Sequence, residues 1–139
     1  MFVRPEYNHG PSGALKNAID FLYKEWNNQA AGFVSYGEAG GVRAVEQLRL
    51  VMAEVQIADV RAQVGLSLVH DFERFTTFRP APTHEAAVQT MFDQLVAWGT
   101  ALRALRKPAS ALRAGATARG IRPNVSAENS EPAQGDSTS

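Results

Sequence analysis

The chain has 139 residues, of which 45% are hydrophobic and 20% charged, an ordinary globular composition with room for about one domain. Its 14 basic residues balance 14 acidic ones, so no net field favours nucleic acid or an anionic membrane as a partner. Cysteine is absent, which excludes disulfides, thiolate metal sites, cysteine nucleophiles and redox dithiols. Any redox chemistry must therefore come from a bound cofactor.

No targeting or membrane signal is visible. The N-terminus lacks the basic, apolar and small-residue pattern of a secretory signal, and no run of about 18 apolar residues occurs. We therefore expect a cytoplasmic protein without a membrane partner.

The chain opens with a short extended run at Phe2 and Val3, followed by a turn and a predicted helix over residues 12–25. Ser12 can cap the first turn of this helix. Apolar residues recur there at helical spacing, namely Leu15, Ala18, Ile19, Leu22 and Trp26. A turn that leads from a strand into a helix is where α/β proteins place their ligands.

The same layout repeats about thirty residues later. Residues 31–36 are nearly all apolar and predict a buried parallel strand, which runs into a glycine-rich loop. A second helix follows the loop, with one face lined by Val42, Val45, Leu48, Met52 and Val55.

A third strand is predicted over residues 59–69 from its alternation of apolar and polar side chains. Residues 70–82 are less periodic and indicate an excursion loop or a short extra turn, in which Phe72, Phe75 and Phe78 could serve the core, a substrate entrance or a subunit interface. Thr83 can cap a last helix that ends near Arg106, before Pro108.

Residues 108–139 have a different composition, rich in Ala, Gly, Ser, Pro, Asn and Glu. Such a segment cannot bury enough apolar surface to offset its ordering entropy, so we predict a disordered tail after a domain at residues 1–107.

The alternation of three strands with three helices predicts an α/β fold with a parallel sheet and right-handed crossovers. Parallel strands are normally buried on both faces, and a sheet of about three strands leaves an edge strand without a neighbour.

The two strand-to-helix turns are expected to form one crevice. Backbone N–H groups at the loop glycines and at the start of the second helix favour electron-rich oxygens, while Tyr7, Tyr36 and Asn8 can add stacking surface and hydrogen bonds. Glycines also serve tight turns that bind nothing, so the loop pattern alone does not decide between the two interpretations.

The combined segments resemble the NADPH-dependent FMN reductases of the flavodoxin-like fold. The resemblance rests on both turns, on the intervening run Gly13, Ala14, Leu15, Lys16, Asn17, Ala18, Ile19, Asp20, and on Arg43. It implies that both turns border the flavin ring of FMN, through Pro5, Glu6, Tyr7, Asn8, Ser35, Tyr36, Gly37, Gly40 and Gly41. Glu38 and Ala39 lie in the second loop but are less diagnostic.

The sequence departs from the family pattern at its start. Family members begin with a strand and a loop rich in Gly, Ser, Arg and Asn that holds the FMN phosphate, and no segment here matches it. We therefore expect an N-terminally truncated fold that binds FMN poorly when alone.

The function that the resemblance implies is an NAD(P)H-dependent FMN reductase, in which hydride passes from NADPH or NADH through FMN to a flavin or quinone-type small-molecule acceptor. No catalytic acid or base is expected, because the protein positions and tunes the ring. No metal site is expected either, because His9, His70 and His84 lack ligand spacing. Family members are commonly dimers or tetramers, so a homo-oligomer is expected.

Two other functions stay open. The chain could be an inactive remnant or scaffold subunit that oligomerises without flavin. It could also be an electron carrier that binds FMN without consuming NADPH, although such carriers are acidic and this chain has no net charge.

Overall fold

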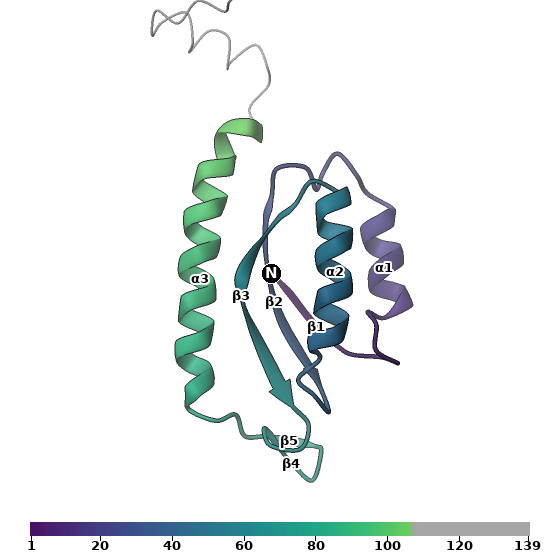
Figure 1. Cartoon of the computed structure of the whole chain (residues 1–139), viewed down its shortest axis with the longest axis vertical. Helices are drawn as coiled ribbons and strands as arrows, with labels where there is room; N and C mark the ends of the chain where they lie inside the picture. The colour runs from purple at the N-terminus through teal and green to yellow at the C-terminus, as the bar shows by residue number, and fades with distance from the viewer. Residues whose placement is uncertain (107–139) are drawn as a thin grey trace, which may run out of the picture. The chain divides into compact units, whose positions relative to one another are not determined.

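The computed structural model describes residues 1–106 as a parallel sheet between two layers of helices (Figure 1). The strands β1 (Phe2–Pro5), β2 (Ala30–Gly37) and β3 (Ala58–Ser67) pair in parallel in the order β1-β2-β3. Helices α1 (Gly13–Asp20) and α2 (Val42–Glu54) cover one face, and α3 (Thr83–Leu102), continued by the 3-10 turn Arg103–Arg106, covers the other. The predicted α/β class, a flavodoxin-like parallel sheet with flanking helices, is confirmed.

Two apolar clusters, one on each face of the sheet, make the core. On the face of α1 and α2, Phe33 of the central strand is fully buried together with Ile19 and Leu48. On the opposite face, Val64 of β3 packs with Met91 of α3. Each fully buried side chain of this kind contributes about 2 kcal/mol. The central strand is therefore fixed from both sides, and so is the loop at its carboxyl end.

Helix α1 is shorter than predicted, because it ends at Asp20 and not near residue 25. Ser12 caps its first turn as expected, with its hydroxyl accepting a backbone N–H at 3.3 Å. Beyond Asp20, side-chain hydrogen bonds fix the chain where further helical turns were predicted. The indole N–H of Trp26 donates to Ile19 O at 3.0 Å, and the Asn27 amide donates to a carbonyl at the end of α2 at 3.1 Å.

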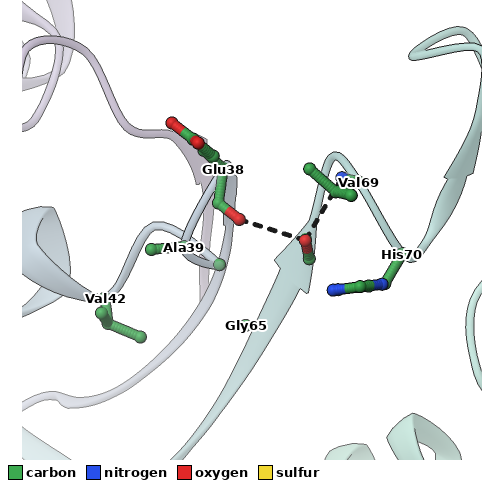
Figure 2. Close-up of a pocket in the computed structure, with 8 residues that line it drawn as sticks. Glu38, Ala39, Val42, Gly65, Val69 and His70 are labelled. Atoms are coloured by element: carbon green, nitrogen blue, oxygen red, sulfur yellow. Dashed lines mark hydrogen bonds between the residues drawn. The ribbon is translucent and has the colours of Figure 1, made fainter.

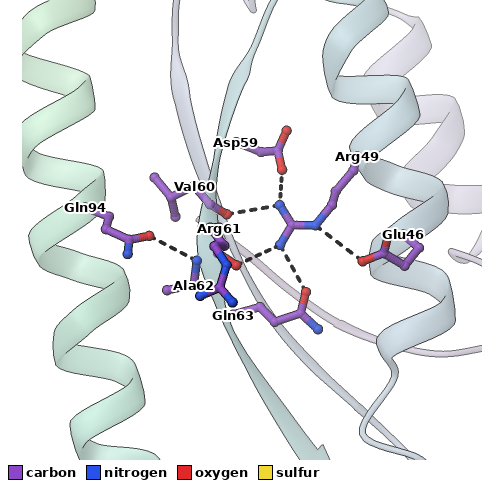
Figure 3. A network of polar contacts seen from close by, with 8 residues as sticks. All are labelled: Glu46, Arg49, Asp59, Val60, Arg61, Ala62, Gln63 and Gln94. Carbon is purple, nitrogen blue, oxygen red and sulfur yellow. Dashed lines mark hydrogen bonds and ion pairs between the residues drawn. The ribbon is translucent and has the colours of Figure 1, made fainter.

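Side chains from α2 and α3 bond to the backbone of β3 where its pairing with β2 is irregular (Figure 3). Arg49 of α2 donates to the carbonyls of Val60 and Arg61 at 3.0 and 3.2 Å and pairs with the Asp59 carboxylate. From the other side, the side-chain oxygen of Gln94 in α3 accepts the N–H of Ala62 in β3 at 3.0 Å. These contacts satisfy backbone groups beside the irregular pairing, and they hold β3 in place between α2 and α3.

The segment after β3, predicted as a loop or short extra turn, contains a small antiparallel hairpin of β4 (Phe72–Glu73) and β5 (Thr77–Phe78). Its turn residues Arg74 and Phe75 adopt left-handed φ values of 52° and 60°. The Phe72 ring lies 6.4 Å from the Tyr36 ring and 5.2 Å from the Phe78 ring, between centroids. Of the roles left open for the three phenylalanines, Phe72 therefore packs beside the second turn, whereas Phe75 is exposed.

Asp71 connects the end of β3 to the segment before α3. Its buried carboxylate accepts the N–H groups of Ser67 at 2.8 Å and Ala81 at 3.1 Å, and it lies 2.8 Å from Nε2 of His84. Burial alone would raise the pKa of Asp71, but these hydrogen bonds outweigh it and lower that pKa. The predicted cap at Thr83 is wrong, because α3 makes no side-chain capping bond and His84 anchors its first turn.

No helix within residues 1–106 is long and apolar enough to cross a membrane. The predicted tail at residues 108–139 lies outside the described part of the chain.

Candidate functional site

The two predicted turns lie side by side at the carboxyl edge of the sheet. Pro5, the last residue of β1, pairs with Tyr36 of β2, and Glu6 N–H donates to Tyr36 O at 2.8 Å. Both strands then run into their loops at the same edge (Figure 1). The structure thus brings together the residues that the resemblance assigned to the flavin ring, and their contact with a flavin stays a prediction.

The first turn is a tight reversal of the chain at Tyr7, Asn8, His9 and Gly10. Tyr7 and Gly10 exchange backbone hydrogen bonds of 3.0 and 2.8 Å, while Asn8 and His9 both adopt left-handed φ values, 46° and 68°. Two consecutive residues without glycine's freedom make this a strained turn, of the kind that clusters at functional sites. The side chain of Gln47 on α2 stabilises it by donating to His9 O at 2.7 Å. Tyr7 is 60% exposed and offers its ring to solvent.

The second turn depends on glycine at Gly40 and Gly41, which have φ values of 72° and 70°. A Cβ on Gly41 would lie 2.8 Å from Ser35 Cβ, and the buried Ser35 hydroxyl closes the loop by donating to Gly40 O at 2.7 Å. The expectation of a free N–H at Gly40 is wrong, because this group donates to Gly37 O at 3.1 Å. These glycines are buried and shape the loop. The donors that remain at this turn are the N–H groups of the first turn of α2, which has no side-chain cap.

Glu6 links the two turns by charge. Its side chain is 10% exposed, and Oε1 lies 3.4 Å from the Arg43 guanidinium in the first turn of α2. The other oxygen, Oε2, is buried and has no hydrogen-bond donor among the described residues. Gly37 lets the two segments approach, since a Cβ there would lie 3.2 Å from Glu6 Cβ. Glu6 therefore holds the first turn against α2, with one acceptor atom left unpaired.

Arg4, in β1 two residues before Glu6, was not identified from the sequence. It is 2% exposed, and none of its three guanidinium nitrogens has a hydrogen-bond partner within residues 1–106. Burial lowers the pKa of Arg4, and the nearby Glu6 carboxylate opposes that shift. One signal was available in the sequence. Arg4 and Glu6 alternate with the apolar residues Val3 and Pro5, which places both charged side chains on one face of the strand.

A hollow of about 510 Å³ adjoins the second turn, between the 37–42 segment and the end of β3 (Figure 2). Its volume is in the range of small-molecule sites. Val42 and Val69 contribute apolar surface and His70 a ring nitrogen. Ser67 closes one side, donating to Glu38 O at 3.1 Å and accepting Val69 N–H at 3.2 Å. Sequence spacing gave His70 no role, and only the fold places it beside this hollow.

The donor set at the two turns fits the flavin of FMN. A flavin ring has flat faces, carbonyl acceptors on its pyrimidine edge and one N–H donor there. The turns offer the exposed Tyr7 ring, the exposed Asn8 side chain and the N–H groups at the start of α2. Among the described residues no cluster of three or more metal-ligating side chains occurs.

Comparison with known proteins agrees with this chemistry. The sequence profile of the NADPH-dependent FMN reductase family matches residues 1–71. The NAD(P)H-dependent FMN reductase ntnL of Nectria sp is 52% identical over 48 residues, which cover 34% of this chain and 24% of that protein. The NAD(P)H-dependent FMN reductase LOT6 of Saccharomyces cerevisiae is 52% identical over 52 residues, covering 37% and 27%. The chain thus spans about a quarter of the length of these two relatives.

A longer match is to a 2-hydroxy-1,4-benzoquinone reductase of Burkholderia sp, which is 29% identical over 107 residues, covering 70% of this chain and 58% of that protein. The family profile spans more than half of the chain and includes both turns, the whole of β1 and β2, and α1 and α2. The chain therefore belongs to the NADPH-dependent FMN reductase family.

Proposed function

We propose that this chain holds the flavin ring of an NAD(P)H-dependent FMN reductase. The observation that carries the proposal is the meeting of the two turns at one sheet edge, joined by the bond from Glu6 N–H to Tyr36 O and by the ion pair of Glu6 with Arg43. Bound FMN would accept hydride from NADPH or NADH and pass the electrons on to a second substrate.

The residues of the two turns have separate tasks in this proposal. Tyr7 stacks on the ring, and Asn8 together with the N–H groups at the start of α2 bonds its polar edge. Ser35, Gly40 and Gly41 set the shape of the loop, and Glu6 fixes the spacing between the turns. Orientation and electrostatics are the contribution of the chain, and no side chain needs to act as an acid or base.

A quinone is the acceptor that we propose. Relatives named NADPH:quinone oxidoreductase 2 in rice and NAD(P)H:quinone oxidoreductase in potato are each 42% identical over 55 residues. The hollow beside the second turn has the mixed apolar and hydrogen-bonding lining that a small ring with carbonyl oxygens requires.

We also propose that the chain forms a homo-oligomer through α1 and α2. Phe21 at the end of α1 is 85% exposed and Leu50 of α2 is 77% exposed, which is unusual for large apolar side chains. The same feature favours the alternative function, a scaffold subunit that assembles without flavin.

Steady-state NADPH oxidation with a benzoquinone acceptor tests the reductase proposal. We expect the purified chain to consume NADPH only when FMN is added. The Tyr7→Ala variant should need about three- to tenfold more FMN for half-maximal rate, the amount that one aromatic contact supplies. Tyr23→Ala, at another exposed tyrosine, is the matched control and should leave the requirement unchanged. If added FMN does not increase the rate of NADPH oxidation and the chain elutes as an oligomer on size-exclusion chromatography, the scaffold function is supported instead.

A further inference from the structure

Three charged side chains, those of Arg4, Glu6 and Arg43, lie near the first turn, and their charges do not sum to zero. Glu6 pairs with Arg43 at 3.4 Å, so their opposite charges largely cancel. Arg4 lies on the same strand face as Glu6, at 2% exposure, and its guanidinium has no hydrogen-bond partner within residues 1–106. An arginine stays protonated in proteins. Among the described residues, Glu6 is the one carboxylate near both arginines, so the three side chains together carry one net positive charge at the strand that leads into the first turn.

Stability does not account for this arrangement. A buried cation without hydrogen-bond partners loses its favourable hydration free energy and gains few interactions in return. An apolar side chain of similar size would make the folded state more stable. A costly group that is kept next to a functional turn points to a function in the site itself.

We propose that Arg4 tunes the bound flavin by stabilising its reduced, anionic form relative to the oxidised ring. The inference rests on the proposed function, in which residues 5–8 border the ring. Hydride transfer from the nicotinamide adds two electrons and one proton to the neutral ring. The reduced ring therefore carries one negative charge until its N1 takes a proton from solvent. A fixed positive charge nearby favours that anion without touching it.

The expected size follows from distance. Neighbouring residues on one strand face are about 7 Å apart, so a ring that contacts the turn after Arg4 lies roughly 10 Å from the guanidinium. At an effective dielectric constant of about 20, a unit charge at that distance changes an equilibrium involving a second unit charge roughly tenfold. For a two-electron couple, tenfold is equivalent to about 30 mV in midpoint potential.

The test measures the affinity of the full chain for oxidised and for reduced FMN, together with the potential of the bound flavin against a reference dye. Arg4→Gln should lose roughly tenfold in affinity for reduced FMN relative to oxidised FMN, lowering the potential by about 30 mV. Arg4→Lys keeps the charge and should keep the ratio. Lys16→Gln removes one positive charge at an exposed site on α1, where solvent screens it, and should also leave the ratio unchanged.

Each outcome separates the inference from the function on which it rests. If the original chain binds neither form of FMN, the proposed function fails, and the role of Arg4 fails with it. If the chain binds FMN and Arg4→Gln alters both affinities equally, the function stands and the tuning role is wrong. Equal effects of Arg4→Gln and Arg4→Lys would also contradict it, since that result indicates packing and not charge.

Discussion

Arg4 and Asp71 are the two buried charged residues of the described chain, and their surroundings are opposite. Asp71 receives hydrogen bonds from two backbone N–H groups and lies against His84, so its charge is stabilised where it lies. Arg4 has no such partners. Substitutions at these two positions should therefore change stability in opposite directions.

Replacing Arg4 with methionine should raise the free energy of unfolding by about 1–3 kcal/mol, because the variant no longer buries an unpaired charge while its side chain keeps most of the apolar contact. Urea denaturation monitored by circular dichroism measures the difference. Lys16→Met, at an exposed position, should stay within about 0.5 kcal/mol. A destabilised Arg4→Met variant would mean that the guanidinium has partners that stabilise the fold.

The Asp71 carboxyl should make stability depend on pH. Its pKa is lower in the folded chain than when unfolded, so its contribution is present above the unfolded value of about 4 and is lost as the pH falls through the folded value. Asp71→Asn should cost about 2 kcal/mol at pH 7, and the gap to the original chain should narrow below about pH 4. Urea denaturation across pH measures this, with the exposed Asp20→Asn as control. A gap that is constant with pH would contradict it.

At the scale of the elements, the second turn is the part most constrained by its sequence. Gly41 begins α2 with a left-handed φ of 70°, and its Cα faces Ser35 with no space for a Cβ. The loop, the end of β2 and the start of α2 therefore depend on one position.

Gly41→Ala should lower the free energy of unfolding by about 1–3 kcal/mol, from backbone strain and from the contact with Ser35. Gly13→Ala is the matched control, because Gly13 begins a helix and a Cβ there meets nothing within 4 Å. Thermal or urea unfolding of both variants and of the original chain measures the difference in free energy of unfolding. Equal stability of the two variants would show that the loop relaxes freely around the added methyl group.

The strands and α2 could be predicted from sequence because their patterns agree with their tertiary neighbours. The end of α1 could not, because Leu22 and Trp26 continue a helical pattern that the Trp26 and Asn27 side chains interrupt through long-range hydrogen bonds. The hairpin after β3 was not predicted either. Its turn uses Arg74 and Phe75 at left-handed φ values, where no glycine or asparagine marks it.

The same division applies to the site. The backbone turns were predictable from their glycines and from the family resemblance. Gln47 was not, since it matters only through its contact with His9 O at 2.7 Å across the fold. Arg4 was missed although its alternation with apolar residues was visible, because its burial without partners appears only in the folded chain.

At the scale of the whole molecule, we propose that residues 1–106 provide a site for the flavin ring. The segment matched to the family includes the two turns that we propose to hold the ring. No stretch of the printed sequence resembles the loop rich in Gly, Ser, Arg and Asn that holds the FMN phosphate in that family. Recognition by this chain should thus depend on the ring and little on the phosphate, which distinguishes it from a site built around the whole cofactor.

The most direct measurement is a titration of the purified chain against FMN and against riboflavin, which lacks the phosphate, followed by quenching of flavin fluorescence. We predict saturable quenching of both, with dissociation constants that agree within about threefold and that both weaken about three- to tenfold in Tyr7→Ala. Absence of quenching at high protein concentration, or equal binding by Tyr7→Ala, would contradict the claim that these two turns hold the ring.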